Sequence, residues 1–170
     1  MLRGAVRDVP DFPKPGIVFK DITPILADPA LFRLSIQHLV QQCAGKQITR
    51  VAGIDARGFL FGATVAHELG VGFAPIRKKG KLPYHTVSHA YALEYGEAEI
   101  EIHTDSFSAG ERVTLIDDLL ATGGTARAAI NLIEGVGAVV VQAQFLIELG
   151  FLNGRAALAP TPVLSLLAYD

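Results

Sequence analysis

One segment of this chain, residues 113–125, constrains its fold and chemistry more than any other. It contains the apolar run Val113–Ile116, then Asp117 and Asp118, then a turn rich in glycine and threonine, and a helical pattern from about Ala126. A short apolar run bounded by turn residues is typical of a buried strand. The segment therefore predicts a strand that ends at two carboxylates and leads through a tight turn into a helix.

The turn has the chemistry of a phosphate site. Gly123 and Gly124 allow the backbone to approach an anion closely, and Thr122 and Thr125 add hydroxyl donors. The first turn of the following helix adds N–H groups that lack intrahelical partners, at the positive end of the helix dipole. The two preceding aspartates suit a sugar diol or a Mg²⁺-bridged group instead. Together these groups predict a site for a phosphorylated sugar.

Two common phosphate-binding patterns are absent from this turn. No lysine follows the second glycine, so the G-x-x-x-x-G-K-[ST] loop of nucleoside triphosphatases is disfavoured, and the dinucleotide pattern G-x-G-x-x-G is missing. The alternative is an ordinary connection, with the aspartates as caps and the glycines for the bend. Two acids and four small residues exceed what such a turn requires, which favours the phosphate site.

Composition narrows the class of protein. The 170 residues suffice for one domain with a buried core, and 50% hydrophobic with 19% charged residues is a globular composition. A net charge of −2 offers no basic field for nucleic acid. No apolar run reaches the roughly 18–20 residues of a membrane span, and the N-terminus lacks a signal-peptide pattern, so a cytoplasmic protein is expected. The single cysteine, Cys43, is expected to be a buried packing residue.

The rest of the chain alternates between helix and strand patterns. Helices are predicted at 31–44, 58–69 and 125–134, and strands at 51–54, 73–76, 98–103, 113–116, 138–146 and 163–167. This alternation predicts an α/β fold with a mostly parallel twisted sheet flanked by helices. Ligands of such sheets bind beyond the carboxyl ends of the strands. We therefore expect Asp55, Arg77 and Asp117, each at or just past a strand end, to share one crevice.

Three regions differ from this pattern. Residues 1–30 contain five prolines and are not expected to form a regular core element. Residues 78–96 form a long, polar connection with glycines, and connections of that length are usually functional or disordered. In residues 98–103, glutamates alternate with isoleucines, which predicts an exposed or edge strand.

Segment 113–126 resembles the PRPP-binding motif of the type I phosphoribosyltransferases. Four further segments narrow the resemblance to the adenine-specific branch: DFPKPGIVFKDITP at 11–24, GIDARGF at 53–59, RKKGKLP at 77–83 and LEYG at 93–96. The similarity extends from about Val9 to the C-terminus. It implies the type I phosphoribosyltransferase fold in a single domain, with a small N-terminal hood at 1–30 that binds the base and a flexible lid loop at 78–96. It also implies a homodimer.

The activity implied by this resemblance is transfer of the 5-phosphoribosyl group of PRPP to N9 of adenine, which gives AMP and pyrophosphate in purine salvage. Mg²⁺ is expected to act with PRPP, without a direct protein site. The implied contacts are Asp117, Asp118, Ala121, Thr122, Gly123, Gly124 and Thr125 for PRPP and AMP; Ala56, Arg57, Arg77, Lys78 and Lys81 for pyrophosphate; and Val18, Phe19, Lys20 and Leu149 for adenine. The family also implies a cis peptide between Ala56 and Arg57.

The resemblance also assigns chemistry to the lid. Glu94 is predicted to protonate N7 of adenine, or to hold that proton as N9 attacks, and Tyr95 to support the closed lid. The alternative for Glu94 is that it is one of several solvated acids in this stretch. His85 and His89 are expected to face solvent; they have no metal-ligand partners at a recognisable spacing, and no role is assigned to them.

Adenine recognition is predicted from the backbone of Val18 and Lys20, with Phe19 stacked on the purine. Adenine presents a donor and an acceptor that match one carbonyl and one amide, whereas hypoxanthine presents the reverse. Lys20 stands where the family often has arginine, a change of little consequence if the backbone reads the base. Phe19 could instead be ordinary core packing, and Arg77, Lys78 and Lys81 a solvated basic loop.

Two other functions remain open from the sequence. A sister enzyme could use the same PRPP site with another base, such as xanthine or orotate. A PRPP-sensing regulator could keep the fold but bind RNA or DNA, although the near-neutral charge argues against it.

Overall fold

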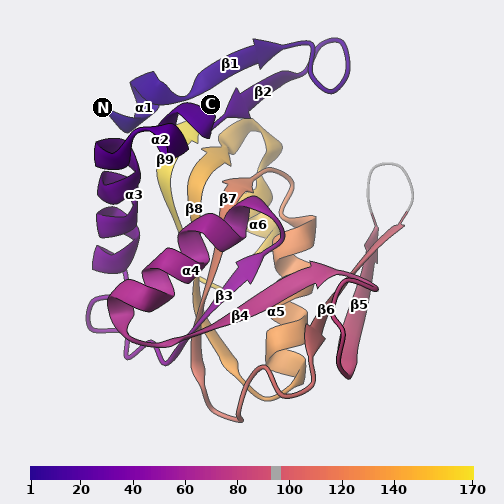
Figure 1. The fold of residues 1–170 in the computed structure, drawn as a ribbon. Helices are drawn as coiled ribbons and strands as arrows, with labels where there is room; N and C mark the ends of the chain where they lie inside the picture. The colour runs from indigo at the N-terminus through magenta and orange to yellow at the C-terminus, as the bar shows by residue number, and fades with distance from the viewer. Residues whose placement is uncertain (93–96) are drawn as a thin grey trace. The chain divides into compact units, whose positions relative to one another are not determined.

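The chain divides into two compact units in the computed structural model, Met1–His38 and Leu39–Asp170. The structure describes residues 1–92 and 97–170. The first unit contains α1 (Leu2–Ala5), β1 (Arg7–Pro10), β2 (Val18–Asp21), α2 (Thr23–Ala27) and most of α3 (Pro29–Gln41). In this unit β1 and β2 form a two-stranded antiparallel sheet (Figure 1).

The prolines of the first unit lie at the ends of its short elements. Pro10 is the last residue of β1, and Pro24 and Pro29 lie at helix starts, where the missing N–H removes no helical hydrogen bond. In the connection between the strands, the Asp11 carboxylate accepts a hydrogen bond from the Gly16 amide at 2.8 Å. The proline-rich segment is therefore not a core element, as predicted, but it has regular structure of its own.

The second unit is a seven-stranded mixed sheet in the order β5-β6-β4-β3-β7-β8-β9. The parallel part comprises β3, β4, β7, β8 and β9, while β6 runs antiparallel to β4 and β5. Helices α4 and α5 cover opposite faces of the sheet (Figure 1). The bounds are β3 (Arg50–Ile54), α4 (Arg57–Leu69), β4 (Gly72–Lys78), β5 (Thr86–Ala92), β6 (Glu97–His103), β7 (Arg112–Leu120), α5 (Gly124–Gly135), β8 (Val139–Leu149), the 3-10 helix η1 (Gly150–Leu152), α6 (Gly154–Ala157) and β9 (Val163–Tyr169).

The predicted α/β fold with a mostly parallel sheet is confirmed, and local chemistry explains its elements. Val113 and Leu115 of β7 are fully buried beside the small residues Ala126 and Ala129 of α5. Alanines on that helix face let it pack closely on the sheet. Gly70 ends α4 in the left-handed conformation (φ 68°), which glycine adopts without steric cost.

The strand that carries the two aspartates is longer than predicted. β7 continues past Asp117 and Asp118 to Leu120, because its pairing with β8 continues beside them: Asp117 pairs with Phe145 and Leu119 with Ile147. The aspartates thus belong to the last part of a sheet strand, and the backbone under them is fixed by the ladder.

The predicted loop at 78–96 is wrong over much of its length. Residues 86–92 form β5, which pairs antiparallel with β6. The sequence pattern explains the strand, because Val87 and Tyr91 share one phase of the β period and pack against the core. The prediction that 98–103 is an exposed or edge strand is also wrong, since β5 takes the edge and β6 lies inside the sheet.

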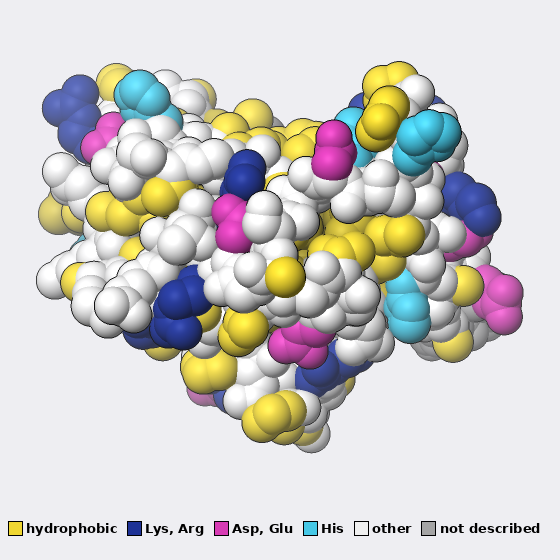
Figure 2. All heavy atoms as spheres, turned by 90° about the horizontal axis from the view of Figure 1, so that it is seen from below, with side chains coloured by type: hydrophobic (Ala, Val, Ile, Leu, Met, Phe, Trp, Pro, Cys, Tyr) yellow, Lys and Arg dark blue, Asp and Glu magenta, His cyan; other side chains and the backbone are white. Residues whose placement is uncertain are grey.

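Other predictions concern the interior and the surface. Cys43 is buried, as predicted, and lies just after α3. Burial raises the pKa of its thiol, which favours the unreactive protonated form. On the face drawn in Figure 2, Lys and Arg side chains are interspersed with Asp and Glu. Among the described residues, no helix has the length and apolar character needed to cross a membrane.

Candidate active site

A cavity of about 290 Å³ lies at the carboxyl ends of β3, β4 and β7 in the second unit. Its wall brings together Asp55, Arg77 and Asp117, the residues predicted to share one crevice. That prediction is confirmed. The other polar side chains of the wall come from Arg57, Lys78, Tyr91, Asp118 and Thr125.

The two aspartates differ in exposure: Asp117 is partly buried and Asp118 is buried. Asp118 is only 6% exposed, and its backbone N–H donates to the Asp117 carboxylate at 2.8 Å. Burial, and then the negative charge of Asp118, raise the pKa of Asp117 well above its ordinary value. The Asp118 carboxylate accepts a hydrogen bond from Nε of Arg57. Two adjacent carboxylates at a cavity wall suit a ligand that donates hydrogen bonds, such as a diol.

Two arginines of the cavity are held by acids. Nε of Arg77 donates to the Asp55 carboxylate at 2.9 Å, and its guanidinium also donates to the Lys81 carbonyl at 3.1 Å. Arg57 is paired with Asp118 on the other side of the cavity. These cations are therefore already oriented at the cavity, where they can bind an anionic ligand.

The cis peptide is one residue earlier than the family resemblance implies. It lies between Asp55 and Ala56, not between Ala56 and Arg57. Ala56 is the N-cap of α4 and Arg57 its first residue, so the peptide between them already belongs to the helix start. The cis bond instead falls at the junction of strand and helix.

A second, smaller cavity of about 100 Å³ is formed by the turn after β7. Gly123, the N-cap of α5, has a φ of 86°, a conformation that favours glycine. Its carbonyl accepts the Arg127 N–H at 2.8 Å and so starts the helical hydrogen bonds. The wall of this cavity contains all five turn residues predicted to contact PRPP and AMP: Ala121, Thr122, Gly123, Gly124 and Thr125.

The sequence analysis missed the segment that supports this turn from behind. The carbonyl of Gly154 lies where a side chain at Gly123 would stand, 2.6 Å from the Cβ position, and a Cβ at Gly154 would collide with the Ala121 carbonyl. Arg127 of α5 donates to the Ala157 and Ala159 carbonyls at 2.8 and 2.7 Å. Glycine at 154 is the one sequence signal that could have indicated such a close backbone contact.

An ion pair between a buried glutamate and a half-exposed arginine fixes the supporting segment to the sheet. Glu148 of β8 is 7% exposed and accepts hydrogen bonds from Arg155 at 3.0 and 2.5 Å and from Ser165 at 2.6 Å. The hydrogen bonds from Arg155 lower the pKa of Glu148. Arg155 also donates to the Val163 carbonyl at 2.5 Å, so α6 is joined to both β8 and β9.

The hairpin of β5 and β6 forms another wall of the large cavity. Glu101, 3% exposed, accepts hydrogen bonds from the backbone of Lys81 and Leu82, both at 3.0 Å. Burial acts to raise the pKa of Glu101, but hydrogen bonds from Leu82, Thr86, Lys81 and Gly80 together outweigh it, and the pKa lies below its ordinary value. The turn that carries Lys81 is thus fixed, although Lys81 itself is not among the described residues of the cavity wall.

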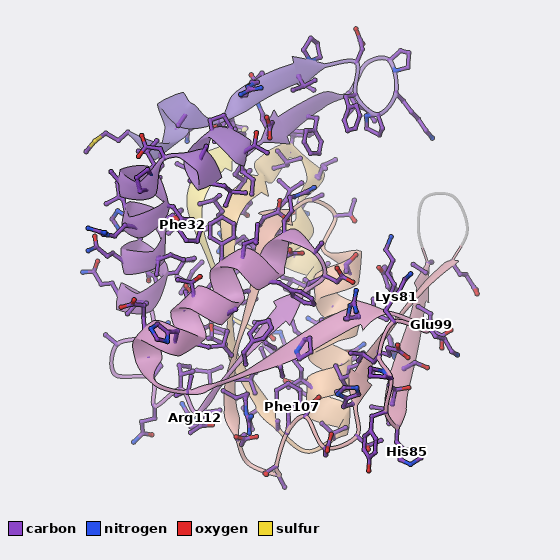
Figure 3. The ribbon with its side chains drawn as sticks, viewed as in Figure 1. Phe32, Lys81, His85, Glu99, Phe107 and Arg112 are labelled. Atoms are coloured by element: carbon purple, nitrogen blue, oxygen red, sulfur yellow. The ribbon has the colours of Figure 1, made fainter. Side chains whose placement is uncertain are left out.

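The histidines of this hairpin differ. Figure 3 shows His85 at the opposite end of the hairpin from Lys81. His85 is exposed, as predicted. His89 is partly buried instead, and its Nε2 lies 3.4 Å from the Asn131 side-chain nitrogen on α5.

The predicted adenine-binding residues belong to β2 and β8. Val18, Phe19 and Lys20 form β2 of the first unit, where Phe19 packs edge-to-face on Phe12 with ring centroids 5.2 Å apart. Leu149 is the last residue of β8 in the second unit. Glu94 and Tyr95 lie outside the described residues.

Comparison with known proteins identifies the family. The family model described as "Phosphoribosyl transferase domain" matches residues 23–151. The adenine phosphoribosyltransferase of Methylococcus capsulatus is 58% identical over 99% of this chain and 98% of its own. The chain belongs to the adenine phosphoribosyltransferase family. It is an enzyme of the transferase class.

Solved structures of adenine phosphoribosyltransferases have the same fold. The enzyme from Thermoanaerobacter pseudethanolicus has a TM-score of 0.97 and 49% identity, covering 99% of this chain and 98% of that one. The enzyme from Trypanosoma brucei, solved in complex with AMP, pyrophosphate and ribose-5-phosphate, has a TM-score of 0.88 and 30% identity, covering 98% and 78%.

The contact behind the turn predicts that Gly154→Ala destabilises the protein. The added methyl group must displace the Ala121 backbone, and overpacking of this kind costs about 1–3 kcal/mol. Gly135→Ala is the matched control, because a Cβ at Gly135 meets no atom within 4 Å. Urea unfolding of both variants measures the difference. Equal free energies of unfolding for the two variants would show that the backbone at Gly154 does not constrain the turn.

Proposed function

We propose that this enzyme transfers the 5-phosphoribosyl group of PRPP to N9 of adenine and releases AMP and pyrophosphate. The observation that carries the proposal is the junction after β7, where Asp117 and Asp118 line the large cavity and the adjoining turn forms a small one. A cavity for a sugar next to a donor-rich turn has the arrangement that a 5-phosphoribosyl group requires.

The turn would bind the 5′-phosphate. Gly123, Gly124 and the first residues of α5 present backbone N–H groups at a helix start, and Thr122 and Thr125 add hydroxyls. The ribose would then lie over β7, with its hydroxyls donating to Asp117 and Asp118. These hydrogen bonds would help to satisfy one buried and one partly buried carboxylate, whose desolvation is otherwise costly.

The diphosphate would lie beside the basic side chains of the large cavity. Arg57, Arg77 and Lys78 contribute positive charge there, and the Ala56 amide is at the start of α4. Binding would exchange partners: Arg57 would turn from Asp118 to the diphosphate as Asp118 takes a ribose hydroxyl. Lys81, on the turn held by Glu101, would add its charge from outside the cavity wall.

Mg²⁺ is proposed to accompany PRPP. Among the residues that the structure describes, no group of three or more His, Cys, Asp and Glu side chains is arranged to hold a metal ion. Carboxylates such as Asp117 and Asp118 suit Mg²⁺ in phosphate sites only together with substrate oxygens, because this ion takes one or two carboxylates plus phosphates. When bound, the ion offsets the negative charge of the leaving diphosphate.

Adenine recognition is proposed for β2. Pro10 lies opposite Val18 in the antiparallel ladder. Because proline lacks an N–H, these two residues cannot form the two backbone hydrogen bonds of a hydrogen-bonded pair. This register therefore favours a non-hydrogen-bonded pair, in which the N–H and C=O of Val18 point away from β1. Such an orientation leaves them able to bind the edge of adenine. Lys20 shares the strand phase of Val18. The stacking of Phe19 on the purine stays a prediction. The contact of Leu149 with the purine also stays a prediction.

Glu94 and Tyr95 keep their proposed roles as proton carrier for adenine N7 and support of the closed lid. Closure of the lid would exclude water from an activated C1. The homodimer and the cytoplasmic location likewise stay predictions from the sequence.

The first experiment is product identification. Purified protein with PRPP, Mg²⁺ and each common nucleobase is expected to form AMP from adenine, at least about 100-fold faster than IMP from hypoxanthine, because the wrong base leaves buried groups unpaired. Chromatography of the nucleotides measures this. Consumption of xanthine or orotate would identify a sister enzyme, and no turnover with any base would favour a regulator.

Asp118→Asn tests the ribose assignment. The variant loses a charged acceptor, and we expect the KM for PRPP to rise about tenfold or more. Asp105→Asn, in an exposed turn, is the matched control and should behave as wild type. A KM for PRPP unchanged in the Asp118 variant would refute the contact between Asp118 and the ribose.

Glu94→Gln tests the proton transfer. A general acid contributes typically 10²–10⁴-fold, so turnover should fall by about 100-fold or more while PRPP affinity changes little. Glu97→Gln, at the exposed start of β6, is the control for loss of an acid in the same hairpin. Near-normal turnover of the Glu94 variant would indicate that Glu94 is one of several solvated acids and not the proton carrier.

A further inference from the structure

A hydrogen bond joins the β5–β6 hairpin to the phosphate turn at the cavity wall. The hydroxyl of Tyr91 on β5 lies 3.0 Å from Oγ1 of Thr125, the second residue of α5. Both residues line the large cavity, and Thr125 lines the small one as well. None of the family segments or predicted roles above includes Tyr91.

The Tyr91 ring is held in place by its surroundings. It is partly buried and packs against the core, and a Cβ added at Gly124 would lie 3.7 Å from its edge. The strand has a second link to α5 in the contact between His89 and Asn131. The attachment of β5 to the helix therefore does not depend on the Tyr91 hydroxyl alone.

Acidity indicates which hydroxyl donates. A phenol, with a pKa near 10, is a stronger donor than the aliphatic hydroxyl of threonine. If Tyr91 donates to Oγ1 of Thr125, the threonine proton must point elsewhere. The N–H groups of the α5 start repel that proton, so it is left for an acceptor in the cavity.

We propose that Tyr91 is a positioning residue for the 5′-phosphate. Its hydroxyl donates to Thr125, which fixes the Thr125 proton toward the phosphate oxygen before the ligand arrives. Donation to Oγ1 also polarises the threonine hydroxyl and strengthens its bond to the anion. The inference rests on the proposed function, because it requires the 5′-phosphate to bind at this turn.

The test is a double-mutant cycle of Tyr91→Phe and Thr125→Val, with ribose 5-phosphate as the binding probe in calorimetry. Tyr91→Phe keeps the ring, and we expect the Kd of this variant for ribose 5-phosphate to rise about fivefold to tenfold. The KM for PRPP should rise in parallel, and the KM for adenine should be unchanged. In the Thr125→Val background, Tyr91→Phe should have no further effect on binding, because the hydroxyl that Tyr91 positions is already absent. In the Thr125→Ser background, which keeps the hydroxyl, Tyr91→Phe should again weaken binding.

Tyr84→Phe is the matched control, because Tyr84 precedes the same strand, is 58% exposed and is not part of the cavity wall. It should bind ribose 5-phosphate as wild type does. Unchanged binding in Tyr91→Phe, or full additivity with Thr125→Val, would overturn the inference. So would an equal rise in both KM values, which indicates a general loosening of the hairpin.

The two proposals fail in different ways. If the wild-type protein forms AMP but Tyr91→Phe leaves binding of ribose 5-phosphate unchanged, only the role of Tyr91 is refuted. Wild-type protein that neither forms AMP nor binds ribose 5-phosphate refutes the proposed function itself, before any variant is made.

Discussion

The site depends on the parallel pairing of β3 with both β4 and β7. This pairing aligns three strand ends at one edge, so that Asp55, Arg77 and Asp117 line one cavity although they are far apart in the sequence. The requirement for close approach also extends to α4. A Cβ at Gly58 would lie 2.8 Å from the Ile116 carbonyl and 2.9 Å from the Asp117 carboxylate, so only glycine lets this helix start beside β7.

The phosphate turn has its shape because other parts of the second unit surround it. Gly154 fills the space behind Gly123, and Arg127 joins α5 to carbonyls at the end of α6 and just after it. The ion pair between the buried Glu148 and the half-exposed Arg155 joins this support to the sheet. Removal of the half-exposed Arg155 would leave the buried Glu148 carboxylate without its cation, so the shape of the anion site is coupled to the stability of the unit.

The pairing of charges within the cavity suits a ligand that combines anionic groups with hydroxyl donors. The arginines are held by carboxylates, Arg57 by Asp118 and Arg77 by Asp55. Under the proposed function, PRPP brings anionic groups for the cations and hydroxyls for the acids, so both partners of the Arg57–Asp118 pair gain ligand contacts when they separate. A ligand with phosphate alone would leave Asp117 and Asp118 unsatisfied, which favours a phosphorylated sugar over a simple anion.

Much of this protein was determined by its sequence alone. The strand before Asp117, the glycine and threonine turn and the alternation of helix and strand depend on local chemistry, so the α/β fold and the crevice at Asp55, Arg77 and Asp117 could be predicted. Tertiary structure decided the rest. Residues 86–92 became a strand because β6 was there to pair with, and Glu101 became buried because backbone N–H groups of a distant turn donate to it. Contacts such as Gly154 with Ala121 or Tyr91 with Thr125 join residues more than 30 positions apart, and no local pattern encodes them.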